Sequence, residues 1–153
     1  MATRTVDVVR PCAASREVVW ELLADVSTWS EWGLFDEARL ESAGPDQPQG
    51  VGARRLLRTG RMRNLEEIFV HEPPHRLAWL VIKGTLPVRN HRSEVQLTEI
   101  PTGGTEIWWR SSYEAKIFGT GWMLDKNLKL FLADAARRLA VRAETGAPPA
   151  DDD

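Results

Sequence analysis

The chain has 153 residues, and its 20 basic and 22 acidic side chains give a net charge of −2. These charges are mixed along the chain without a basic stripe, which argues against a nucleic-acid partner. The longest apolar run, Leu77–Ile82, is far shorter than the ~20 residues that cross a bilayer. The length fits one domain, which we expect over residues 1–145, followed by a disordered acidic tail over residues 146–153.

Cysteine usage and motifs exclude several classes of site. Cys12 is the single cysteine, so no internal disulfide can form, and we expect a cytoplasmic protein without a secretory signal. The segment His71-Glu-Pro-Pro-His75 superficially resembles a zinc motif, but its two prolines prevent the helix that such a motif needs. The chain has no phosphate-binding loop or dinucleotide-binding glycine pattern. We therefore expect no metal and no cofactor.

The first quarter of the chain predicts a strand followed by two helices. Residues 3–10 alternate loosely and predict a strand that ends at Pro11. Ser15 precedes apolar residues at helical spacing up to Val26, which predicts a helix with Ser15 as its N-cap. Residues 28–33 predict a short second helix that ends at a glycine.

Six further strands follow at hairpin spacing, separated by turns that are rich in glycine and proline. The predicted strands are Phe35–Ser42, Val51–Thr59, Met62–His71, Arg76–Lys83, Val88–Glu99 and Thr105–Ala115. Strands joined in this way form an antiparallel sheet, and a sheet of about seven strands twists and curls.

The last predicted element is a long amphipathic helix from Trp122 to Glu144, with an apolar face at a period of 3.6 residues. The fold class is therefore α+β in the order β-α-α-β-β-β-β-β-β-α, with a curled sheet around the C-terminal helix. A helix laid across a strongly curled sheet touches it more easily at its ends than in its middle. This order of elements predicts an apolar cavity between the sheet and the helix.

The segment Ala14–Trp32 resembles the first-helix signature of the START-like (SRPBCC) superfamily, in its polyketide cyclase/dehydrase-like branch. Gly50-Val-Gly, Pro73-Pro-His-Arg-Leu and Gly103-Gly-Thr-Glu-Ile-Trp-Trp resemble the same group in the same order, as does the glycine-rich entry to the final helix. The resemblance spans residues 3 to about 144. It implies the helix-grip fold with a hydrophobic cavity. It does not imply one function, because members include cyclases, hydrolases, ligand carriers and sensors.

Alternation along Thr105–Ala115 indicates which side chains face the cavity. The even positions carry most of the charge, so the odd set, which includes Trp109, Ser111 and Tyr113, should face inward. Trp108 then lies on the outer face.

The same parity, continued backwards along the preceding strand, turns Ser93, His91 and Arg89 inward. His91 is then the candidate acid or base, with Arg89 or Tyr113 stabilising an oxyanion in an aldol-type cyclisation or dehydration. Alternatively, His91 is partly solvated or hydrogen-bonded within the wall. A β-bulge between Asn90 and Ser93 would invert the parity.

Glu66 and Glu67 are adjacent, so one of them must face each side of the sheet. Which one faces inward stays open, because both alternating sets of this strand contain apolar residues. An inward pair with an arginine would be an anchor for a carboxylate or enolate, and the neighbouring hairpin carries Arg54, Arg55, Arg58, Arg61 and Arg63. Charge pairs on the outer face are the alternative.

The sequence favours a protein that binds a small hydrophobic or aromatic molecule, such as a lipid, isoprenoid or polyketide-like compound. The predicted ligand-binding residues are Trp109, Tyr113, Ser111, Ser93, Leu124, Asn127, Leu128 and Phe131. The runner-up is a cofactor-independent cyclase or dehydratase that uses the same cavity. A third possibility is a partner bound to the outer face, where Trp108 and Arg110 point. We expect a monomer or homodimer.

Overall fold

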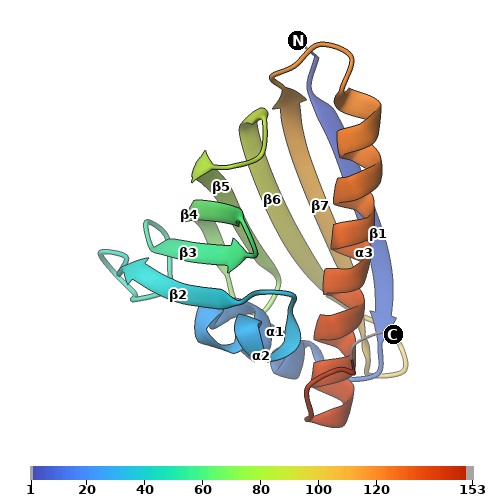
Figure 1. Cartoon of the computed structure of the whole chain (residues 1–153). Coiled ribbons are helices and arrows are strands. Elements are labelled where there is room, and N and C mark those ends of the chain that lie inside the picture. Colours follow the sequence, from blue (N-terminus) through green and yellow to red (C-terminus); the bar gives the residue numbers. More distant parts are fainter. Residues whose placement is uncertain (1, 151–153) are drawn as a thin grey trace.

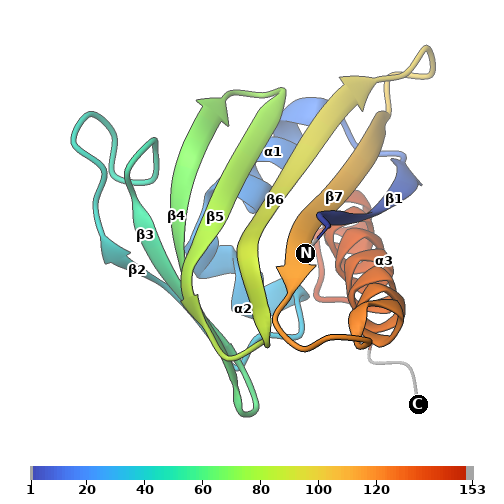
Figure 2. The same ribbon diagram turned by 90° about the horizontal axis from the view of Figure 1, so that it is seen from above.

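The computed structural model describes residues 2–150 of the chain, and its centre is one antiparallel sheet in the order β1-β7-β6-β5-β4-β3-β2 (Figure 1). Its strands are β1 (Arg4–Cys12), β2 (Glu37–Ser42), β3 (Arg54–Thr59), β4 (Met62–Glu72), β5 (Arg76–Gly84), β6 (Val88–Glu99) and β7 (Thr105–Ala115). The view from above in Figure 2 shows the sheet curling from β2 round to β1. The predicted α+β class and element order are confirmed.

The helices are α1 (Arg16–Ala24), the 3₁₀ turn η1 (Val26–Thr28), α2 (Trp29–Trp32) and α3 (Gly121–Thr145). Ser15 caps α1 as predicted, because its Oγ accepts a hydrogen bond from the backbone nitrogen of Val18 at 3.4 Å. The short helices lie at one end of the sheet, and α3 runs along β1 and β7 (Figure 1). Gly146 follows the last residue of α3 and caps it, with a φ of 68°, the left-handed conformation that glycine adopts readily.

The N-terminal strand is longer than its sequence predicts. Pro11 lies inside β1, opposite Glu106 of β7, instead of ending the strand. The reason is that β1 is an edge strand, with a neighbouring strand on one side only. Proline has no backbone N–H, and on the open side of an edge strand there is no partner to which that N–H would donate.

The core is built around interlocked tryptophans. The indole rings of Trp29, Trp32, Trp79 and Trp109 are all buried, and their neighbouring centroids lie 5.3–6.5 Å apart in tilted or edge-to-face contacts. Aromatic rings prefer such geometry because the positive edge of one ring meets the negative face of another. Most tryptophans therefore pack the core, and three of these four also reach the cavity described below.

Two strands contain irregularities that matter for the site. Register shifts occur in β4 between Leu65 and Glu66 and again between Ile68 and Val70. Strand β6 shifts between Arg89 and Arg92, where Asn90 has a φ of 51°. A bulge of this kind adds one residue to one strand and changes which side chains face inward.

None of the helices within residues 2–150 is long and apolar enough to cross a membrane. The same residues contain no group of three or more His, Cys, Asp or Glu side chains placed to hold a metal ion. The predicted tail over residues 146–153 lies partly outside the described residues. Its disorder, and the domain boundary at residue 145, stay predictions.

Candidate functional site

A cavity of about 290 Å³ lies between the concave face of the sheet and helix α3. Most of its wall is aromatic or aliphatic, with polar groups contributed mainly by β4, β6 and β7. The lining residues are Trp29, Phe35, Leu57, Thr59, Met62, Arg63, Asn64, Glu66, Trp79, Leu86, His91, Ser93, Trp109, Ser111, Leu124, Asn127, Leu128, Phe131 and Leu132.

Helix α3 supplies one wall of the cavity. Leu124, Asn127, Leu128 and Phe131 recur at intervals of three and four residues, which places them on one side of a helix. All four line the cavity, as the sequence predicts. Phe131 meets Phe35 edge to face, with ring centroids 6.0 Å apart, and so joins the helix to the segment before β2.

Two serines form a hydrogen-bonded pair on the opposite wall. Ser93 of β6 and Ser111 of β7 are direct cross-strand partners, both buried, and their Oγ atoms lie 2.6 Å apart. One hydroxyl must donate to the other, so the hydrogen of the accepting hydroxyl stays free to serve another group. The inward orientation predicted for Ser93, Ser111 and Trp109 is confirmed.

His91 faces the cavity as predicted, and only 8% of its surface is exposed. Neither ring nitrogen has a hydrogen-bond partner within residues 2–150. Burial lowers the pKa of His91 from 6.5 to about 4 because the charged form is poorly solvated there. At neutral pH the ring is therefore uncharged and presents one donor and one acceptor.

The prediction that Arg89 lies on the inner face is wrong. Arg89 is exposed, pairs across the strands with Glu114 of the outer face, and does not line the cavity. The cause is the bulge at Asn90, which adds a residue to β6 between Arg89 and Arg92. Residues on either side of the bulge therefore follow opposite parities, and only His91 and Ser93 face the cavity.

Tyr113 has a different place from the one predicted. Its ring is buried 6.3 Å from that of His91, between centroids, but Tyr113 does not line the cavity. Its hydroxyl donates to the carboxylate of Asp125 on α3, which also accepts from Arg4 of β1, with Nη2 and Oδ2 2.7 Å apart. Burial and the hydrogen bond to Asp125 hold the pKa of Tyr113 above its ordinary value. The hydroxyl is thus engaged in attaching α3 to the sheet.

Glu66 lines the cavity, whereas Glu67 points outward and pairs with Arg54. Arg55, the cross-strand partner of Glu66, is also buried, and its Nη2 lies 2.7 Å from Oε1 of Glu66. Burial raises the pKa of Glu66, and the charge of Arg55 acts in the opposite sense. Sequence reasoning left this pair open because both sets of alternate positions in β4 contain apolar residues.

The guanidinium of Arg55 lies between two tryptophan rings. Its Cζ is 4.4 Å from the ring centroid of Trp29 and 4.7 Å from that of Trp79, distances typical of cation–π contacts. Nε and Nη1 of Arg55 have no hydrogen-bond partner in the described part of the chain. The two rings therefore supply part of the stabilisation that water gives to an exposed guanidinium.

Several polar groups of the cavity wall have hydrogen-bond donors or acceptors that no protein group of residues 2–150 satisfies. Nε1 of Trp109 and both nitrogens of His91 have no partner in residues 2–150, and the serine pair has one free hydroxyl hydrogen. Buried polar atoms are nearly always hydrogen-bonded in proteins. Here they face an apolar cavity, so a ligand that carries polar atoms at matching positions can satisfy them.

Several known proteins resemble this chain. A START superfamily protein from Mycobacterium smegmatis shares its fold with a TM-score of 0.81 at 14% identity, over 94% of this chain and 99% of that one. The protein XoxI from Bacillus cereus has a TM-score of 0.72 at 15% identity, over 92% and 94% of the two chains. A Thermobifida fusca protein has a TM-score of 0.72 at 20% identity, over 97% and 99%.

These structural likenesses establish the fold alone. Comparison with curated proteins finds no match. The model of one family, described as polyketide cyclase / dehydrase and lipid transport, matches residues 3–144, which is nearly the whole chain. The chain therefore belongs to the polyketide cyclase/dehydrase and lipid transport family and has the START-like fold.

Proposed function

We propose that the chain binds one small, mostly apolar molecule in the cavity and orients it by one or two uncharged oxygen groups. The observation that carries this proposal is His91, buried in an apolar wall with both ring nitrogens unpartnered among the described residues. Carbonyl and hydroxyl oxygens match the unpartnered atoms of His91, Trp109 and the serine pair. Aromatic polyketide-like compounds and oxygenated isoprenoids have this chemistry.

The size of the cavity limits the ligand. Ligand pockets typically measure roughly 300–1,000 Å³, and this one, at about 290 Å³, is at the small end of that range. A compact molecule of a few rings, or a short isoprenoid, fits such a volume better than a lipid with two acyl chains. The wall also favours flat aromatic ligands, because Trp29, Trp79 and Trp109 all contribute ring surface.

A cavity-filling substitution tests the proposal. Leu128→Phe adds a ring to the cavity wall, whereas Leu130→Phe makes the same change on the same helix at a position that is 62% exposed. We expect hydroxylated and ketone-bearing polycyclic aromatics to bind the wild-type chain saturably, as measured by calorimetry or native mass spectrometry. Leu128→Phe should weaken binding at least tenfold and Leu130→Phe should leave it unchanged. Equal affinity in both variants would place the ligand elsewhere.

Catalysis of a cyclisation or dehydration in the same cavity is the second candidate function. It is supported by the family and by His91, whose ring faces the cavity. However, an imidazole whose conjugate acid has a pKa of about 4 is a weaker base than an ordinary histidine. That weakness is why binding is proposed first. Turnover of a linear polyketone that is lost in His91→Gln, while affinity for the same compound persists, would establish the enzyme instead.

A further inference from the structure

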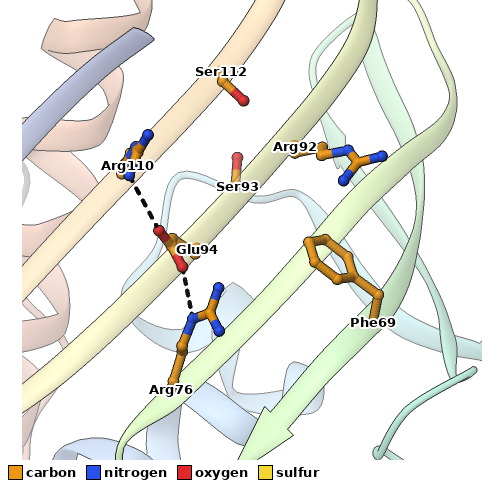
Figure 3. A pocket seen from close by; sticks show the side chains of 7 residues that line it. All are labelled: Phe69, Arg76, Arg92, Ser93, Glu94, Arg110 and Ser112. Atoms are coloured by element: carbon orange, nitrogen blue, oxygen red, sulfur yellow. Dashed lines mark hydrogen bonds and ion pairs between the residues drawn. The ribbon is translucent and has the colours of Figure 1, made fainter.

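The outer face of the sheet carries a second, shallower pocket of about 210 Å³, on the side away from α3 (Figure 3). Strands β4 to β7 supply its walls, and its side chains are mostly charged. The residues that line it are Phe69, Arg76, Arg92, Ser93, Glu94, Arg110 and Ser112. This pocket is unrelated to the proposed ligand of the apolar cavity.

Positive charge exceeds negative charge in the outer pocket. Arg76 and Arg110 share the carboxylate of Glu94, with Nε of Arg76 2.7 Å from Oε2 and Nη1 of Arg110 3.6 Å from Oε1. Figure 3 shows Glu94 between these two arginines. The remaining arginine of the pocket, Arg92, adds a further cation. Glu72 also lies 4.0 Å from Nη1 of Arg76, so the three arginines face two carboxylates and one positive charge is left in excess. Glu94 holds two of the three guanidinium groups in place.

Arg92 differs from the other two arginines of the pocket in its surroundings. No carboxylate of residues 2–150 lies within 4.0 Å of its guanidinium, whose Cζ is 5.5 Å from the ring centroid of Phe69. The cross-strand neighbours of Arg92 are Leu80 and Ser112, which are uncharged. The hydrogen-bond donors of this guanidinium are therefore available to a ligand.

The register places a second arginine on the same face of the sheet, at a diagonal position to Arg92. Ser112 is directly opposite Arg92, and Arg110 is two residues before Ser112 on the same face of β7. Diagonal neighbours of this kind are about 7–8 Å apart at Cα, a span that long side chains bridge. Arg110 also lies over the outward-facing ring of Trp108, with Cζ 5.7 Å from its centroid.

We propose that this outer pocket binds a phosphate monoester, with Arg92 and Arg110 holding the phosphate and Phe69 contacting the organic group. Guanidinium groups bind phosphate through paired, charge-assisted hydrogen bonds, and arginine clusters recognise phosphorylated ligands. A phosphate monoester carries about −1.5 to −2 charges at neutral pH and three strong acceptor oxygens, so it attracts guanidinium groups more strongly than one carboxylate does. Ser112 can donate its hydroxyl hydrogen to a phosphate oxygen.

Titration of the ¹⁵N-labelled chain with phenyl phosphate, inorganic phosphate and benzoate, at about 150 mM salt, tests the proposal. We expect saturable amide shifts at Arg92, Arg110 and Ser112, with phenyl phosphate binding more tightly than inorganic phosphate and benzoate binding weakest. Equal binding of the two phosphates would overturn the role of Phe69. Shifts that instead centre on Trp109 and Leu128 would place the probe in the apolar cavity and overturn the site.

Two variants that each remove one positive charge distinguish specific binding in the outer pocket from non-specific attraction of anions to a basic surface. Arg92→Gln should weaken phenyl phosphate binding about tenfold. Arg89→Gln removes the same charge from the same strand and face, outside the pocket, and should change the affinity less than twofold. An equal loss in both variants would show only screened charge attraction and overturn the proposal. Arg92 is exposed, so both variants should fold, and their amide spectra verify it.

Discussion

Arg55 and Glu66 form an ion pair inside the protein, with 2.7 Å between Nη2 and Oε1 and almost no solvent exposure of either side chain. Glu66 lies in the cavity wall, and the rings of Trp29 and Trp79 enclose the guanidinium of Arg55. A buried pair gains its attraction only after both charges have been removed from water. Its two members should therefore depend on each other strongly.

Removal of the carboxylate alone should be costly. Glu66→Leu leaves the Arg55 guanidinium buried without a counter-charge, so we expect a loss of about 3–5 kcal/mol in the free energy of unfolding. The double variant Arg55→Met with Glu66→Leu removes both charges and should recover most of that loss. Urea unfolding of the wild type and these two variants measures both effects. A loss below about 1 kcal/mol in the single variant would contradict a buried, mutually dependent pair.

Protonation of His91 should destabilise the fold in a defined pH window. Its pKa is about 4 in the folded protein against 6.5 when exposed, so the unfolded chain binds the proton more tightly. The effect is absent above pH 6.5, grows as the pH falls, and is complete below about pH 4, where it reaches roughly 3 kcal/mol.

The measurement is the difference in unfolding free energy between wild type and His91→Gln from pH 4 to pH 7.5. The difference removes contributions from other titrating groups, including His71, whose pKa burial also lowers. Wild type should lose stability relative to His91→Gln as the pH falls through this window. A difference that does not vary with pH would show that His91 is solvated in the folded protein.

The sequence predicts the fold well where one face of an element is clearly charged. On β7 the charged even positions mark the outer face, and α3 has one continuous apolar stripe, so Trp109, Ser111, Leu124 and Leu128 could be placed by counting. Counting fails where a strand gains a residue. Counting misplaces Arg89 because it treats a bulge near Asn90 only as an alternative, and alternation by itself does not show where a strand gains a residue.

Other features of the site depend on contacts between distant segments. Glu66 could not be distinguished from Glu67, because β4 is irregular on both sides of this pair and apolar at both sets of positions. Alternation correctly turned Tyr113 inward, but the engagement of its hydroxyl by Asp125 depends on how α3 sits against the sheet. No sequence pattern within β7 or α3 alone predicts how the helix is positioned against the sheet.

Tyr113 should matter for stability and not for ligand binding. Tyr113→Phe removes the hydrogen bond to Asp125 and leaves the ion pair of Asp125 with Arg4, so we expect a loss of about 1–2 kcal/mol in unfolding free energy. Affinity for an aromatic cavity ligand should change less than twofold. Ser111→Ala, which removes a hydroxyl from the cavity wall, is the comparison and should weaken binding more. A Tyr113→Phe variant that folds normally but no longer binds the ligand would show that the Tyr113 hydroxyl takes part in ligand binding.

The bulge in β6 depends on the conformation of Asn90, whose φ of 51° is unfavourable for most residues with a side chain. Asn90 also donates from its side-chain amide to Glu114. Asn90→Ala removes that hydrogen bond and keeps the positive φ, so it should cost about 1–2 kcal/mol in unfolding free energy. Asn90→Gly loses the same hydrogen bond but relieves the backbone, and should cost less than Asn90→Ala. Equal stability of Asn90→Ala and Asn90→Gly would mean that the backbone conformation at Asn90 carries no cost and that the bulge is held by its neighbours.

The bulge also sets the direction of His91. The pH dependence assigned to His91 should therefore persist in Asn90→Gly and weaken in any variant that straightens the strand.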